Sequence, residues 1–169
     1  IRSVLRLKEN SQIALFNGEE GEWLSTIKTI AKKFVELEVI EQIKLQEVIS
    51  DIWLVFAPIK RTRIDYLAQK ATELGAGALW PIFTKYTSVS RVNAERLRSN
   101  SIEAAEQSGR LTVPKILDPI DFDTLIEKWP HDRDLFCLDE TGKGAPILDA
   151  FRSSHQRASA LLLGQEGGF

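Results

Sequence analysis

The sequence contains very few side chains that form disulfides or bind metal ions. Among its 169 residues it has one cysteine, Cys137, and two histidines, His131 and His155. One cysteine cannot form an internal disulfide, and the histidines have no recognisable ligand spacing around it. Cys137 lies in the apolar run 134–139, which predicts a packed and unreactive thiol. We therefore expect no disulfide and no metal site, and a reducing cytoplasmic location.

Long apolar runs are also lacking. No stretch reaches the roughly 20 apolar residues that cross a bilayer, and residues 1–8 lack the long apolar centre of a signal peptide. The content of 43% hydrophobic and 27% charged residues, with only 10 glycines and 6 prolines, is typical of a folded protein. We expect no membrane partner. The start at Ile1 and the end at Phe169, just after an apolar run, favour a chain that is cut at both ends.

The net charge is only −2, but the charges are unevenly distributed. Residues 58–115 carry ten Lys or Arg and five Asp or Glu, whereas residues 116–169 carry five and ten. A basic block of this kind can contact nucleic acid, or it can be an ordinary solvated helix surface. Charge alone leaves both interpretations open.

The first 49 residues have the pattern of a small β domain. Alternating apolar and polar residues predict strands at 12–16, 23–30 and 34–40, and Asn17-Gly18 is a strong hairpin signal. We expect a small barrel or a curled sheet.

From residue 50 onward, strand and helix patterns alternate. The expected strands are residues 52–57, 78–83, 135–138 and 158–163, and the expected helices are residues 63–74, 93–108, 122–129 and 147–153. Such alternation is typical of a mostly parallel α/β sheet. In the last helix, Ile147, Leu148 and Phe151 form an apolar face that is either core or a subunit interface, with core favoured.

Candidate ligand-binding residues follow the strands, because ligands of parallel sheets bind beyond the carboxyl ends of the strands. The three segments that stand out are residues 57–63, 138–142 and 163–169. The last is rich in glycine, which lets a ligand approach the backbone, and Glu166 is an available acceptor or base. It lacks the motifs of phosphate-binding loops. By spacing alone, a structural turn is as probable as a ligand loop.

The segment Leu-Gly-Gln-Glu-Gly-Gly-Phe at residues 163–169 resembles the Gly-Pro-Glu-Gly-Gly-Phe signature of the ribosomal RNA small subunit methyltransferase E family, which is of the SPOUT class. Gln165 stands where the family has proline. Residues 4–8, 70–75, 103–107, 113–114 and 139–140 resemble the family in matching order. The resemblance implies a small PUA-like β-barrel domain at residues 1–49, which binds RNA. A SPOUT α/β knotted methyltransferase domain follows at residues 50–169, with the knot segment beyond Phe169.

The resemblance also implies an activity, a cofactor and partners. The activity is S-adenosylmethionine-dependent methylation of uridine N3 in 16S ribosomal RNA, as free RNA or in the small ribosomal subunit, by a homodimer. The implied catalytic residues are Arg110, for charge stabilisation, and Glu166, for proton uptake. The residues implied to bind the methyl donor, S-adenosylmethionine, are Leu138, Asp139, Glu140, Leu163, Gly164, Glu166, Gly167 and Gly168. The implied RNA-binding residues are Lys60, Arg61, Arg63, Gln107 and Arg110.

Two alternatives belong to other functional classes. The chain could be a non-catalytic RNA-binding protein that uses the β domain and the basic segment 58–115. It could also be an enzyme that binds a nucleotide through the glycine-rich segment. Binding of S-adenosylmethionine, of RNA alone, or of ATP or GTP separates the three hypotheses.

Overall fold

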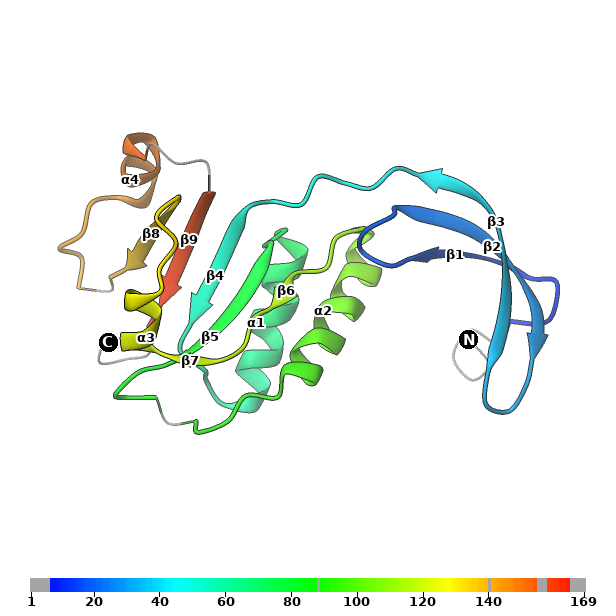
Figure 1. The fold of residues 1–169 in the computed structure, drawn as a ribbon, viewed down its shortest axis with the longest axis horizontal. Helices are drawn as coiled ribbons and strands as arrows, with labels where there is room; N and C mark the ends of the chain where they lie inside the picture. Colours follow the sequence, from blue (N-terminus) through cyan, green and yellow to red (C-terminus); the bar gives the residue numbers. More distant parts are fainter. Residues whose placement is uncertain (1–6, 88, 140, 155–157, 165–169) are drawn as a thin grey trace. The chain divides into compact units, whose positions relative to one another are not determined.

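The computed structural model describes residues 7–87, 89–139, 141–154 and 158–164 (Figure 1). The chain forms two compact units, which divide between Val48 and Ile49. The first unit is all β, and the second combines a largely parallel sheet with helices.

The first unit is a three-stranded antiparallel sheet of order β1-β2-β3. Its strands are β1 (Gln12–Phe16), β2 (Glu22–Ile30) and β3 (Val35–Lys44). The hairpin expected at Asn17 is confirmed, since the Asn17 side chain accepts hydrogen bonds from the backbone N–H of Glu19 and of Glu20, both at 2.9 Å. β3 continues four residues past its predicted end, because residues after Ile40 keep pairing with β2 as far as Lys44 opposite Glu22.

The second unit contains the expected parallel sheet, of order β6-β5-β4-β9-β8. Its strands are β4 (Ile52–Phe56), β5 (Ala78–Phe83), β6 (Lys115–Ile116), β8 (Arg133–Leu138) and β9 (Ala158–Leu163). Two short strands were not predicted: β6, which pairs with the start of β5, and β7 (Ile120–Asp121), which pairs with its end. The α/β class expected from the sequence is therefore confirmed.

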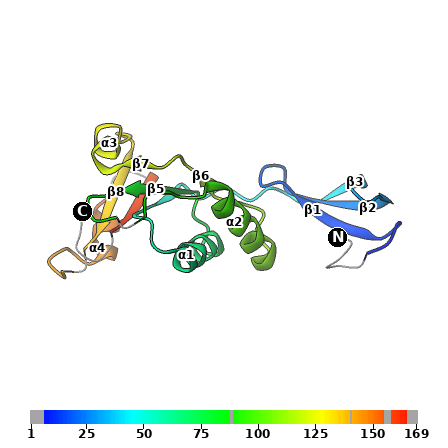
Figure 2. The same ribbon diagram turned by 90° about the horizontal axis from the view of Figure 1, so that it is seen from below.

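Helices cover both faces of this sheet. α1 (Arg61–Glu73) and α2 (Ala94–Ser108) lie on one face and α3 (Phe122–Glu127) on the other (Figure 2). The predicted cap of α2 is confirmed, because Asn93 Oδ1 accepts the N–H of Arg96 at 2.9 Å. α3 ends two residues earlier than predicted, since Pro130 disfavours helical backbone at Trp129.

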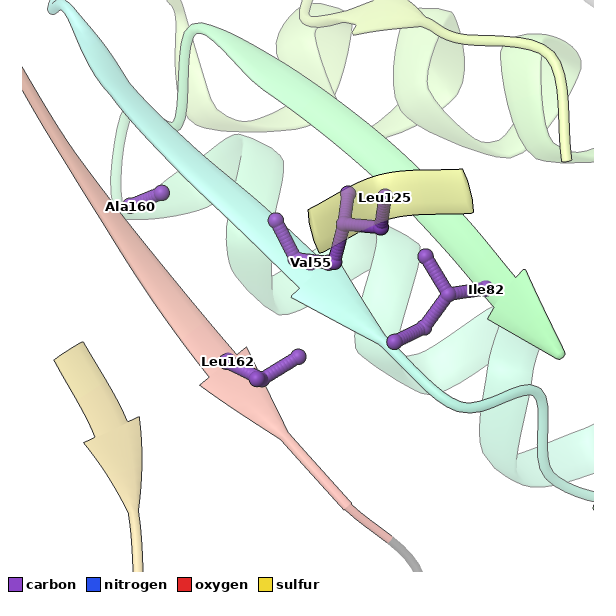
Figure 3. Packing of buried hydrophobic residues seen from close by; sticks show 5 residues of the cluster. All are labelled: Val55, Ile82, Leu125, Ala160 and Leu162. Atoms are coloured by element: carbon purple, nitrogen blue, oxygen red, sulfur yellow. The ribbon is translucent and has the colours of Figure 1, made fainter. Parts of the chain in front are cut away.

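Apolar side chains fill the space on both sides of the sheet. Under α3, the buried cluster comprises Val55, Ile82, Leu125, Ala160 and Leu162 (Figure 3). Under α1 and α2, it comprises Phe56, Ala68, Ala71, Leu79 and Leu97. Neighbouring residues of one strand thus face opposite clusters, which fixes the register and the position of each strand end.

Two expectations about the β8 side of the sheet are wrong. Cys137 is exposed rather than packed, because β8 is the outermost strand next to β9. Partial desolvation, followed by the nearby Asp139 carboxylate, raises the pKa of the Cys137 thiol, which disfavours the reactive thiolate. α4 (Ile147–Ser153) contains no buried residue, and Leu148 is 66% exposed. Phe151 packs against β8, with its ring centroid 4.3 Å from that of Phe136.

The described part of the chain offers no helix long and apolar enough to cross a membrane. Among the same residues, no three or more His, Cys, Asp or Glu side chains form a cluster that could hold a metal ion.

Candidate functional site

The three strand ends singled out in the sequence meet at one edge of the sheet. Leu163 at the end of β9 is in register with Phe56 of β4 on one side and with Leu138 of β8 on the other. The backbone N–H of Ala57 donates to the Leu163 carbonyl at 3.0 Å, which continues the pairing past the end of β4. The carboxyl edge of β4, β9 and β8 is therefore a single surface, where ligands of parallel sheets bind.

A cavity of about 380 Å³ opens beside the end of β8. Its lining comes from β8, the following loop and the start of α4, and consists of Leu135, Phe136, Cys137, Leu138, Asp139, Gly142, Gly144, Ala145, Ile147 and Ala150. Leu138 and Ile147 are 37% and 38% exposed, so apolar surface faces solvent here. We call this space the β8 cavity.

Asp139 is the acidic group of the β8 cavity. Its carboxylate accepts hydrogen bonds from the hydroxyl of Thr141 at 2.5 Å and from the Thr141 N–H at 2.9 Å. These bonds, first the hydroxyl and then the backbone one, lower the pKa of Asp139. The carboxylate is therefore negatively charged at neutral pH and stands at a defined position in the cavity wall.

The predicted donor-binding residues fall into three groups. Leu138 and Asp139 line the β8 cavity. Leu163 packs against the cluster under α1 and α2, and Gly164 follows it as an exposed residue. Glu140, Glu166, Gly167 and Gly168 lie outside the described residues, so their roles stay predictions.

Three of the predicted RNA-binding residues lie near the same edge, because α1 begins directly after β4. Lys60 is the N-cap residue of α1 and is exposed, and Arg63 is exposed in the first turn. Arg61 is the first residue of the helix, and its side chain is outside the described part of the structure.

Arg110 lies at the opposite edge of the sheet. Its Nε donates to the Glu73 carbonyl at the end of α1, at 2.7 Å, and its guanidinium lies against Gly75. The end of α1 is next to the amino ends of the strands, since Gly77 N–H bonds the carbonyl of Ile52, the first residue of β4. Within one chain, Arg110 is therefore not brought together with Asp139 or Gly164. Gln107, in the last turn of α2, bonds Glu103 at 3.1 Å and is likewise away from them.

A second cavity at the carboxyl edge was missed by sequence reasoning. It measures about 750 Å³, and its lining consists of Ile59, Lys60, Ile64, Asp65, Val89, Arg91, Val92, Asn93, Arg96 and Leu97. We call it the α1–α2 cavity, because it lies where both helices begin. The signal available in the sequence was Arg91, a cation between a strand end and the cap of the next helix.

Comparison with known proteins links both units to RNA modification. Residues 1–40 match the model of the RNA methyltransferase PUA domain, and residues 46–169 match that of the RNA methyltransferase domain. The chain is similar to the ribosomal RNA small subunit methyltransferase E of Rickettsia conorii, with 34% identity over all of this chain and 69% of the relative. For the protein of the same name from Synechocystis sp., identity is 29% over all of this chain and 57% of the relative.

A solved structure has the same fold. The ribosomal RNA small subunit methyltransferase E of Neisseria gonorrhoeae, bound to S-adenosyl methionine, superimposes with a TM-score of 0.84 at 26% identity. The match covers 99% of this chain and 71% of that one. These findings confirm the resemblance indicated by the motifs, and the chain therefore belongs to the ribosomal RNA small subunit methyltransferase E family.

Proposed function

We propose that this chain provides the RNA-binding β unit and much of the catalytic unit of an enzyme that methylates a uridine at N3 in 16S ribosomal RNA, using S-adenosylmethionine. The observation that carries the proposal is the meeting of the β4, β9 and β8 ends beside the β8 cavity, in a chain of this family. The Neisseria gonorrhoeae relative, which is bound to S-adenosyl methionine, supports the choice of donor.

The residues of the β8 cavity fit such a donor. Its volume of about 380 Å³ is within the range of small-molecule sites, roughly 300–1,000 Å³. Leu138 and Ile147 offer apolar walls for an adenine ring, and the Asp139 carboxylate can accept hydrogen bonds from hydroxyl or amino groups. We assign the binding of S-adenosylmethionine to Leu138, Asp139, Glu140, Leu163, Gly164, Glu166, Gly167 and Gly168.

When bound, S-adenosylmethionine supplies an electrophilic methyl group on a positively charged sulfur. The protein has the remaining tasks. It aligns the uridine N3 with the methyl group, it accepts the N3 proton, and it stabilises the negative charge that develops on the uracil ring. Glu166 is the proposed proton acceptor.

Arg110 is the group proposed to face the developing negative charge. In one chain its guanidinium is held at the opposite edge by the Glu73 carbonyl. The proposed role therefore places Arg110 of one chain beside the donor site of a second copy, in a homodimer. The exposed apolar side chains of Leu138, Ile147 and Leu148 support an interface next to the β8 cavity.

Arg110→Ala is expected to slow methyl transfer more than it weakens donor binding, since a guanidinium opposite a developing anion acts mainly in the transition state. We would measure the rate of single-turnover methylation and the affinity for S-adenosylmethionine. Both measurements use the natural-length protein, which means a chain as long as those of the relatives. Thermal unfolding reports separately on the lost bond to Glu73.

Mixed dimers test whether Arg110 acts across the dimer. Arg110→Ala subunits are mixed with subunits in which the β8 cavity is blocked by Ala145→Trp. Each mixed dimer then contains one complete site, so activity should reappear on mixing. If mixing restores nothing although mixed dimers form, Arg110 acts only within its own chain, as a helix-end contact.

Donor binding tests the proposed function directly. Calorimetric titration of the natural-length protein with S-adenosylmethionine should show about one site per chain, and ATP and GTP should not compete. RNA binding without any donor binding would instead support the non-catalytic RNA-binding hypothesis.

A further inference from the structure

The α1–α2 cavity has the chemistry of a site for a polyanion. Three cationic side chains line it, Lys60, Arg91 and Arg96, against one carboxylate, Asp65. That carboxylate is already engaged, because Arg96 donates to its two oxygens at 2.8 and 2.6 Å. Among the described side chains, neither Lys60 nor Arg91 forms an ion pair, and both are exposed. The charge left over in the cavity wall is therefore positive.

The start of α1 adds to this positive potential. Lys60, its N-cap residue, makes no side-chain capping bond, and the first turn contains no acidic residue. The N–H groups of that turn and the helix dipole therefore favour an anionic group from outside the helix. At the start of α2, by contrast, Asn93 already caps the Arg96 N–H.

The other walls of the cavity are apolar. Ile59, Ile64, Val89 and Val92 contribute to the lining, and Ile64 and Val92 also pack against the buried cluster under α1 and α2. Apolar walls beside cations suit a nucleotide, which combines a flat apolar face with a phosphate. The volume of about 750 Å³ is within the range of small-molecule sites.

The cavity also lies at the edge where the donor site is proposed. Ile59 is two residues beyond Ala57, whose N–H bonds the Leu163 carbonyl at the end of β9. An RNA strand whose target base reaches the proposed donor site can continue along the same edge into the α1–α2 cavity, where the leftover charge is positive.

We propose that the α1–α2 cavity binds an unstacked nucleotide that flanks the target uridine, with Arg91 and Lys60 on its phosphates and Val89 against its base. This proposal rests on the proposed function and makes Arg91 a substrate-positioning residue. Arg96 is held by Asp65 and keeps the floor of the cavity in place.

The phosphate contacts are tested by the salt dependence of RNA affinity. The probe is a single-stranded RNA with the sequence around the methylated uridine, bound to the natural-length protein at several salt concentrations. Arg91→Ala and Lys60→Ala should each weaken binding about five-fold at physiological salt. Each should also reduce the slope of log affinity against log salt by about 0.7, the value of one phosphate contact on a single strand.

Arg98→Ala is the matched control, since Arg98 is an exposed arginine of α2 that does not line the cavity. It should change affinity and slope much less than Arg91→Ala. Val89→Trp fills the cavity without changing charge, so it should weaken RNA binding and slow methylation while keeping the donor affinity.

The outcomes separate this inference from the proposed function. Equal effects of Arg91→Ala and Arg98→Ala, together with normal RNA binding by Val89→Trp, would overturn the cavity assignment even in an active methyltransferase. Failure of the proposed function would instead appear in the unaltered protein, as no donor binding and no methyl transfer.

Discussion

Ala145→Trp is expected to abolish S-adenosylmethionine binding while the protein stays folded and still binds RNA. Ala145 is exposed in the loop that lines the β8 cavity, so an indole side chain can enter the cavity without displacing a buried group. Filling a site of about 380 Å³ leaves too little room for a donor of that size. We expect a loss of affinity on the order of 100-fold or more, measured by calorimetric titration.

Arg152→Trp is the matched control for this variant. Arg152 lies on α4, its side chain is 79% exposed, and it does not line the cavity. It therefore adds the same bulky side chain to the same region and should leave donor affinity within about two-fold of the unaltered protein. Unchanged donor affinity in a folded Ala145→Trp variant would move the donor site away from the β8 cavity.

Gly77→Ala is expected to have the largest effect on stability. A Cβ atom at Gly77 would lie 2.0 Å from the carbonyl oxygen of Ser50, which is a backbone atom. Gly77 is also fixed by two backbone bonds, from its N–H to the Ile52 carbonyl at 2.8 Å and from the Lys115 N–H to its carbonyl at 3.0 Å. The clash can be relieved only by separating these segments, at the amino edge of β4, β5 and β6.

We expect Gly77→Ala to lower the free energy of unfolding by about 3–5 kcal/mol, and Tm by about 10 °C or more. Gly144→Ala is the control, because a Cβ atom there meets nothing within 4 Å. That change should leave Tm nearly unaltered or slightly raised. Thermal unfolding of both variants checks the prediction, and similar Tm values for the two would show that the close approach of Gly77 to Ser50 is not rigid.

The periodicity of the sequence predicted most of the secondary structure, because each element is encoded by neighbouring residues. The strands at residues 12–16, 78–83 and 158–163 and the helix at 147–153 have the predicted bounds. The strand at 52–57 ends one residue earlier than predicted. The cap at Asn93 was recognisable because a capping side chain bonds within three residues of itself.

Strand order was not recognisable in this way, and the wrong expectations depend on it. Cys137 was expected to be packed because its segment is apolar, but that segment forms the outermost strand beside β9. β7 was missed because two residues that pair only with the end of β5 carry no periodic signal.

In the candidate site, too, some features follow from local sequence patterns and others depend on the tertiary arrangement. The strand ends at Leu138 and Leu163 were found because chain order in a parallel sheet places them at one edge. The position of Arg110 and the α1–α2 cavity depend on how separate helices meet, through contacts such as Arg110 to Glu73 and Arg96 to Asp65, which are 37 and 31 residues apart. No local pattern encodes such contacts.

The measurement that tests the central claim most directly is analysis of the methylated product. The natural-length protein is incubated with S-adenosylmethionine and either 16S ribosomal RNA or small ribosomal subunits that lack the modification. The RNA is then digested, and its nucleosides are identified by chromatography and mass spectrometry. The proposed function predicts one added methyl group per RNA, in 3-methyluridine, and none with the Ala145→Trp variant. RNA that binds tightly but gains no methyl group, or that gains it on a base other than uridine, would contradict the proposed function.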